Sequence, residues 1–263
     1  AIPEFKEQNY NMTLSEFKII FWWEWAHRQL GRLIGLTVLI PMIYFTFKNG
    51  FWILKKYGII FFLVCLQGFI GWYMVSSGLI DRVDVSHYRL SLHLFTAFII
   101  LSIVFWKFLQ LTNLKENQIS IRLYTIKFFI LLIFLQLIIG AFVSGMDAGK
   151  IYNSWPLMGN TYFPNDNNIE NLFKLSAFSD PSLVQFIHRN LAYLIGLFYV
   201  LIFFKVYKNK ISKLYRSVNI LGFFIILQII LGIFTIILGA QIYIAAVHQV
   251  SSIFLVTSSI YFF

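Results

Sequence analysis

Charge and cysteine are both scarce in this chain. Of its 263 residues only 12% are charged, and its single cysteine, Cys65, lies inside an apolar run. A soluble domain carries roughly 25% charged residues, so the composition argues against one. One cysteine excludes an internal disulfide framework and a CxxC metal or redox motif. We therefore expect Cys65 to be a small buried side chain.

Apolar residues are abundant instead, at 59% of the chain. They gather into runs of about 18–25 residues, the length of a helix that spans a bilayer. Seven runs are found, at about 29–47, 57–79, 90–112, 124–145, 190–206, 217–239 and 243–263. Because lipid offers no partner to backbone polar groups, each run must be helical. The predicted fold class is all-α: a polytopic membrane protein with seven spans.

Acidic residues are also few, at 11 against 21 basic ones, and the net charge is +10. Three loops, 48–56, 105–127 and 205–217, hold twelve of the lysines and arginines but only one acid, Glu116. Such alternation is the positive-inside pattern, which points these loops to the cytoplasm or matrix. Segments 1–27, 80–92, 146–187 and 239–243 then face the outer compartment. The charge therefore fits a lipid bilayer as partner, and no nucleic acid.

An internal repeat relates the two ends of the chain. Residues 24–36 (EWAHRQLGRLIGL) and 185–197 (QFIHRNLAYLIGL) are identical at seven of 13 positions, at an offset of 161. The repeat joins spans of the same orientation, so we expect two halves related by an axis along the membrane normal. A Leu-Gln-x-x-x-Gly pattern occurs on three spans, at Gln67, Gln136 and Gln228. It predicts close helix approach and hydrogen bonds between helices.

The longest loop, at about 146–187, is rich in Asn, Asp, Pro and aromatic residues. Loops of this length are usually functional or disordered. The aromatic residues, including those of Tyr152-Asn153-Ser154-Trp155-Pro156, favour an ordered lid over the outer face.

Four of the five histidines lie at one depth. His27, His93, His188 and His248 each fall within about two turns of the outer end of a predicted span, two in each repeat. Ionisable groups in a membrane are costly and usually functional. Two histidines on neighbouring helices can bind heme iron from both sides. A lone interfacial histidine is more simply explained by snorkelling or helix capping, and we apply that interpretation to His87, which lies in the polar 80–92 loop without a repeat partner.

Charged residues accompany these histidines. Glu24 precedes His27 by three residues and so shares its helix face, whereas the repeat places Gln185 at the equivalent position. Glu24 could accept protons or hydrogen-bond the imidazole, or it could simply pair with Arg28 or Arg32. The arginines beside the histidines, Arg28, Arg32 and Arg189, could pair with heme propionates or could be ordinary interfacial residues.

Several strings resemble the heme A synthase family in its proteobacterial and mitochondrial (type 2) branch. They are Glu16-Phe17-Lys18, residues 21–32 (FWWEWAHRQLGR), 66–75 (LQGFIGWYMV), 84–94 (DVSHYRLSLHL), 140–149 (GAFVSGMDAG), 152–158 (YNSWPLM), Phe186-x-His188-Arg189 and His248-Gln249. The resemblance covers nearly the whole chain. The strings around His27 and Trp155 are specific to that branch.

This resemblance implies a fold and an activity. The family has eight transmembrane helices in two pseudo-symmetric four-helix halves, and it oxidises the C8 methyl of heme O to a formyl group, which gives heme A for terminal cytochrome oxidase. By resemblance, His188 and His248 are axial ligands of a heme b cofactor in the C-terminal half, 117–263. His27 and His93 hold the substrate heme in the N-terminal half, 1–116, and Glu24 matches the family's required acidic residue.

The chain departs from the family at its start. The family's first helix, with its Gly-Gly-Leu-Thr-Arg signature, has no counterpart, so the seven spans correspond to helices two to eight of a longer protein. The implied location is the bacterial inner membrane with heme sites near the periplasmic face, or the mitochondrial inner membrane. The candidate partners are the heme O substrate, heme O synthase and an electron donor, with a homo-oligomer as a candidate assembly.

Two other functions remain open from the residues alone. A diheme b-type cytochrome for electron transfer also needs two histidine pairs, but it needs no acid such as Glu24 in one half only. A transporter with parallel repeats calls for polar groups at the bilayer midplane. Here the polar groups cluster at the outer edge, which disfavours a transporter.

Overall fold

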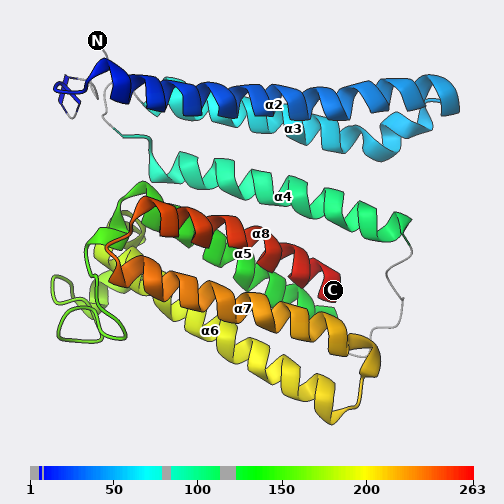
Figure 1. Ribbon diagram of the computed structural model, residues 1–263. Helices are drawn as coiled ribbons and strands as arrows, with labels where there is room; N and C mark the ends of the chain where they lie inside the picture. The colour runs from blue at the N-terminus through cyan, green and yellow to red at the C-terminus, as the bar shows by residue number, and fades with distance from the viewer. Residues whose placement is uncertain (1–5, 8, 79–83, 113–122) are drawn as a thin grey trace. The chain divides into compact units, whose positions relative to one another are not determined.

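The computed structural model describes residues 6–7, 9–78, 84–112 and 123–263 (Figure 1). Its long helices are α2 (Leu14–Asn49), α3 (Trp52–Gly78), α4 (His87–Leu111), α5 (Leu123–Gly145), α6 (Pro181–Lys208), α7 (Tyr215–Ile237) and α8 (Ile242–Phe262). Short 3-10 helices are η1 (Ala148–Lys150), η2 (Ile169–Phe173), η3 (Leu175–Ser179) and η4 (Ser212–Leu214). No strand forms among the described residues, only one isolated bridge between Met158 and Thr161.

Seven of these helices, α2 to α8, are long and apolar enough to cross a membrane. The predicted all-α fold class and the seven predicted spans are therefore confirmed. The chain forms two compact units, Ala1–Ile100 and Leu101–Phe263, with the boundary inside α4. The predicted boundary between the halves, at 116–117, lies outside the described residues.

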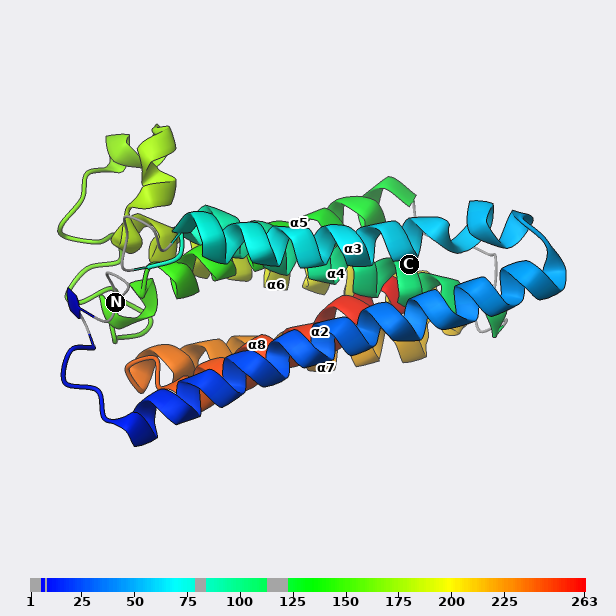
Figure 2. The same ribbon diagram turned by 90° about the horizontal axis from the view of Figure 1, so that it is seen from above.

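In the first unit, α2 and α3 pack against each other and run antiparallel from the turn at Gly50 (Figure 2). Gly50 has a φ of 95°, which favours glycine, and its N–H bonds the carbonyl of Thr46. Helix α2 begins at Leu14, well before the predicted span, because Thr13 and Glu16 form a capping box at its start. With 36 residues it is about 54 Å long, which exceeds the roughly 30 Å of the hydrocarbon layer.

In the second unit, α5 to α8 form a four-helix bundle, in which α5 packs on α6 and α8, and α7 packs on α6 and α8 (Figure 1). Its buried core includes Phe129, Ile133, Leu221 and Val256. Helix α6 starts at Pro181, where Asp180 caps the N–H of Leu183 and proline fits the first helical position. This start lies nine residues before the predicted span, so α6 extends beyond the apolar run at its outer end.

Two local expectations prove wrong. Cys65 is exposed on α3 rather than buried, since its side chain lies on the face of α3 that no other described helix covers. His87 is the first residue of α4 rather than part of a polar loop, and its ring packs against Tyr88 with ring centres 4.1 Å apart.

Candidate heme-binding site

His27 and His93 face each other in the first unit. The imidazole of His27 on α2 and that of His93 on α4 have ring centres 6.4 Å apart, with planes at 75°. Two imidazoles that bind one metal ion through bonds of about 2 Å have ring centres roughly 6 Å apart. The structure thus brings this predicted pair together at a spacing that fits an iron atom between the rings.

His188 and His248 lie on α6 and α8 of the second unit, and both side chains are partly buried. The Nδ1 atoms of both rings are buried and have no hydrogen-bond partner among the described residues. Buried polar atoms are normally satisfied, so an orphaned ring nitrogen marks a place where a ligand belongs. The donor chemistry, two neutral imidazoles in an apolar helix bundle, fits an axially bound heme.

The number of ligands also favours heme over a bare metal ion. Among the described residues, no group of three or more His, Cys, Asp or Glu side chains could hold a metal ion. Protein zinc sites need three or four such side chains. A porphyrin supplies its own four nitrogens, so two histidines suffice.

Each of three histidines is held by a glutamine of the preceding helix. The amide nitrogen of Gln67 lies 2.9 Å from the backbone oxygen of His93, that of Gln136 lies 3.0 Å from the oxygen of His188, and that of Gln228 lies 3.1 Å from the oxygen of His248. The predicted hydrogen bonds between helices from the Leu-Gln-x-x-x-Gly pattern are therefore confirmed. Their target, the histidine itself, was not predicted.

Glu24 and Arg28 form an ion pair at the outer part of α2. Their side chains are 2.6 Å apart and remain 60% and 61% exposed, respectively. Pairs this exposed contribute little to stability. Arg32, four residues further, donates to the side-chain oxygen of Gln29 instead. Of the two alternatives that the sequence left open for Glu24, the structure shows the pairing with Arg28, and the role as proton acceptor stays a prediction. The carboxylate remains accessible on the helix that carries His27.

The equivalent positions of the second unit are built differently. Gln185 and Arg189, which correspond to Glu24 and Arg28 in the repeat, are both buried. Gln185 donates to the backbone oxygen of Tyr152, while Arg189 donates to those of Tyr152, Ser154 and Leu157. Arg189 therefore holds this loop, a role that neither of the alternatives drawn from the sequence, propionate pairing or an ordinary interfacial arginine, included.

The loop between α5 and α6, the predicted lid, is thereby fixed to the N-terminal end of α6, so its expected order is found, whereas its place at the outer face stays a prediction. Besides Arg189, the indole N–H of Trp155 donates to the hydroxyl of Tyr193 over 2.9 Å. The side-chain amide of Asn153 donates to the backbone of Gly149 and of Ile236, which ties the loop to η1 and α7. Sequence reasoning identified the loop but not these anchors.

Asp166 organises the outer part of this loop, where it accepts hydrogen bonds from the hydroxyls of Tyr152 and Ser182. Partial burial opposes ionisation, but these hydrogen bonds outweigh it and hold the pKa of Asp166 below its usual value. Burial, together with the bond to Asp166, raises the pKa of Tyr152. The carboxylate is thus the ionised acceptor that joins the loop to the start of α6.

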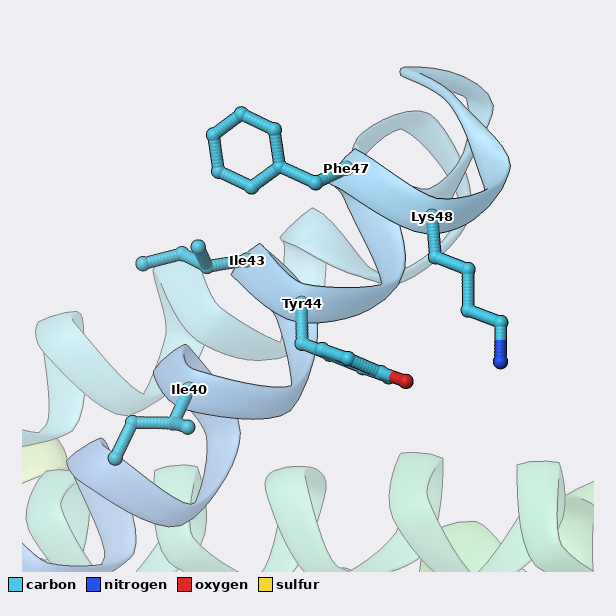
Figure 3. A pocket seen from close by; sticks show the side chains of 5 residues that line it. All are labelled: Ile40, Ile43, Tyr44, Phe47 and Lys48. Carbon is cyan, nitrogen blue, oxygen red and sulfur yellow. The ribbon is translucent and has the colours of Figure 1, made fainter.

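A shallow apolar groove occurs elsewhere, near the C-terminal end of α2. It is lined by Ile40, Ile43, Tyr44, Phe47 and Lys48 (Figure 3). Lys48 lies 5.7 Å from the ring centre of Tyr44, an arrangement typical of a lysine at a membrane interface. Thirteen residues of helix separate Ile40 from His27, about 20 Å, so this groove is distinct from the histidine pair.

Comparison with known proteins shows the family of this chain. Residues 1–260 match the model of the cytochrome oxidase assembly protein family, COX15-CtaA. The chain is 47% identical over 259 residues to the heme A synthase of Pelagibacter ubique, covering 98% of this chain and 76% of that protein. It is 39% identical over 267 residues to that of Rickettsia felis (98% and 78%) and 38% identical over 269 residues to that of Flavobacterium psychrophilum (98% and 79%). The chain therefore belongs to the cytochrome oxidase assembly protein family, within which its relatives are heme A synthases.

Proposed function

We propose that this protein is a heme A synthase, a membrane oxidoreductase that converts the C8 methyl of heme O to the formyl group of heme A. The family membership and three relatives of that name support it. The observation that carries it is the facing pair His27 and His93 in the first unit, with the repeat-related His188 and His248 in the second. An exposed acid, Glu24, precedes His27, whereas the equivalent position before His188 is the buried Gln185.

The C-terminal unit, in this proposal, holds heme b between His188 and His248. The family implies heme, and heme b is the finer assignment we propose. A heme with two histidine ligands supplies electron transfer when bound, because both axial positions are filled. The chain contributes the two imidazoles, an apolar bundle and the loop that Arg189 anchors to α6.

The N-terminal unit holds the substrate heme O between His27 and His93. Conversion of a methyl to an aldehyde through the alcohol, with water as the source of the oxygen atom, removes four electrons and releases four protons. In this proposal the electrons would leave to a separate electron-transfer partner in the membrane. Glu24, three residues before His27 on the same helix face, is in place to accept a proton at its carboxylate. Its side chain also contacts Arg28 over 2.6 Å. We assign Glu24 the catalytic role.

The orientation proposed places both sites near the periplasmic face of a bacterial inner membrane. Support comes from the basic loops: the α2–α3 turn carries Lys48, Lys55 and Lys56, and the α6–α7 connection carries Lys208, Lys210 and Lys213. Both lie at the helix ends opposite the histidines. Basic loops stay on the cytoplasmic side, so the histidine ends face outward.

The test is a pyridine hemochrome spectrum and porphyrin extraction of the purified full chain. Heme b together with heme O or heme A is expected. Two hemes b per chain, without heme O or A, would replace this proposal with a diheme electron-transfer cytochrome. A preparation that binds no heme under heme-replete expression would contradict both.

A further inference from the structure

His93, His188 and His248 each make a second contact with the preceding helix, besides the hydrogen bond from its glutamine. In each Leu-Gln-x-x-x-Gly element, the glycine lies directly beneath the imidazole ring. A methyl group added to the glycine would lie 2.9 Å from Cε1 of His93 at Gly71, 3.1 Å from Cε1 of His188 at Gly140, and 3.3 Å from Cε1 of His248 at Gly232. Cε1 is the ring atom nearest to the glycine in all three cases, so each imidazole points the same atom at its partner helix.

The spacing of the element explains why both contacts occur together. Residues four apart lie on one face of a helix, one turn from each other. The glutamine bonds the histidine's backbone oxygen, and the glycine one turn later leaves the space that the ring of that same histidine fills. One residue fixes the backbone of the ligand helix, and the other fixes the position of the ring.

These contacts point to a ligand rather than to helix packing alone. A glycine that serves close helix packing meets the backbone of its neighbour, but at Gly71, Gly140 and Gly232 all of the nearest atoms belong to an imidazole. Gly68, one turn from Gly71 on α3, meets nothing within 4 Å. The side-chain oxygens of Gln67 and Gln136 are buried without a hydrogen-bond partner among the described residues, and so is Nδ1 of His188 and of His248. Helix packing alone does not explain why these buried polar atoms lack hydrogen-bond partners.

The elements differ in one detail, which sets Gln228 apart from Gln67 and Gln136. The amide of Gln67 also reaches the ring nitrogens of His93, at 3.2 and 3.4 Å, and that of Gln136 reaches Nε2 of His188 at 3.3 Å. The amide of Gln228 instead donates to the hydroxyl of Ser251 over 2.6 Å, and that hydroxyl donates to the backbone oxygen of His248. His248 is therefore held by its backbone through two side chains, and its ring is free of the glutamine.

We propose that the Gln-x-x-x-Gly element, at Gln67–Gly71, Gln136–Gly140 and Gln228–Gly232, is a positioning device that sets the plane of each heme-binding imidazole. The inference rests on the proposed function, because it takes His93, His188 and His248 as axial ligands. Glutamine and glycine touch the histidine and act through it. The orientation of an axial imidazole changes the electronic state of the iron, so the element tunes the heme as well as retaining it.

The experiment compares glycine variants of the full chain purified in detergent. Gly140→Ala and Gly232→Ala each place a methyl group against an axial imidazole. Gly196→Ala on α6 is the matched control, since a methyl group there meets only Ile229 at an ordinary 3.7 Å. The readouts are heme b per chain, the EPR g values of the low-spin ferric heme, and its midpoint potential. The g values depend on the mutual orientation of the two imidazole planes and are insensitive to a loss of fold stability alone.

We expect both variants to shift the g values and the midpoint potential and to weaken heme b retention by about tenfold, the scale seen when a residue that orients a metal ligand is lost. Gly196→Ala should match the wild type in all three. Gln136→Leu, which removes the amide at similar volume, provides a second test if Gly140→Ala does not accumulate, and it should shift the same g values. Unchanged g values and potential in Gly232→Ala and Gln136→Leu overturn the inference.

A failure of the proposed function gives a different result. If His188→Ala and His248→Ala retain the wild-type heme b spectrum, the ligand assignment itself is wrong and the glycine variants have no bearing on heme. In the N-terminal unit the same comparison uses Gly71→Ala against Gly68→Ala on α3. The first should lower the heme O and heme A recovered by extraction, and the second should leave them unchanged.

Discussion

Arg189 donates a 2.9 Å hydrogen bond to the backbone oxygen of Tyr152, across 37 positions of the chain. The same guanidinium reaches two further loop carbonyls, and it lies next in sequence to His188. The buried guanidinium of Arg189 therefore ties the lid of the second unit to the helix that carries His188, a proposed heme ligand.

We expect replacement of the Arg189 guanidinium to loosen the lid. Arg189→Lys keeps the charge but cannot serve three carbonyls at fixed angles. A hydrogen bond from a charged group contributes about 1.5–3 kcal/mol, so the loss of even one should open the loop measurably. We expect faster proteolysis within 152–163 and a change in Trp155 fluorescence. Arg32→Lys, at an exposed arginine, is the control and should alter neither; equal proteolysis of both variants would refute the anchoring role.

The second prediction concerns the ligands of heme b. His188→Ala and His248→Ala should each abolish the bis-histidine spectrum, because the remaining imidazole leaves one axial position open. His87→Ala, at the start of α4, should retain it in full. Reduced-minus-oxidised spectra of the purified proteins measure this. Retention of the low-spin band after loss of either ligand would exclude that residue.

Much of this fold could be predicted from the sequence because the bilayer enforces it. Runs of apolar residues located all seven spans, and errors arose where a helix continues beyond lipid. Helix α2 starts at Leu14 and α6 at Pro181, and both starts carry capping signals in the sequence: Thr13 with Glu16, and Asp180 before proline. Hydrophobicity alone overlooks such signals, because capping residues are polar.

The site was harder to predict than the spans. The repeat identified the histidines as pairs, since identity at a fixed offset needs no three-dimensional information. The contact between Gly140 and the ring of His188 depends on the register of α5 against α6, which no single-helix pattern contains. The target of Arg189 was missed for a related reason: backbone oxygens of a loop have no signature in the residue types.

The lid should also respond to acid. The folded-state pKa of Asp166 lies below its usual value, so its stabilisation is complete above the unfolded value of about 4 and is lost as pH falls through the folded pKa. We expect Trp155 fluorescence to change reversibly in this acidic range. Asp166→Asn should show the loosened lid already at neutral pH and no further acid transition. A transition that persists unchanged in this variant would assign it to another group.

The last prediction uses the difference between the two units at equivalent positions. Glu24→Gln converts the N-terminal position to the residue found at 185 in the C-terminal unit. The variant keeps the size and hydrogen-bonding capacity of the side chain but cannot take up a proton. We expect heme b at wild-type level, heme O retained, and heme A reduced by at least about a hundredfold, the lower range for loss of a general base. Porphyrin extraction followed by chromatography measures all three.

The reciprocal change tests whether a carboxylate at the equivalent position of the second unit is sufficient to create an oxidising site. Gln185→Glu places a carboxylate where the amide now donates to the backbone oxygen of Tyr152. A buried carboxylate facing a carbonyl is repelled unless it binds a proton, so this variant should loosen the lid and lower heme b without creating a second oxidising site. If Glu24→Gln still forms heme A at the wild-type rate, the acid is dispensable. The ion pair with Arg28 is then only an interfacial feature of α2.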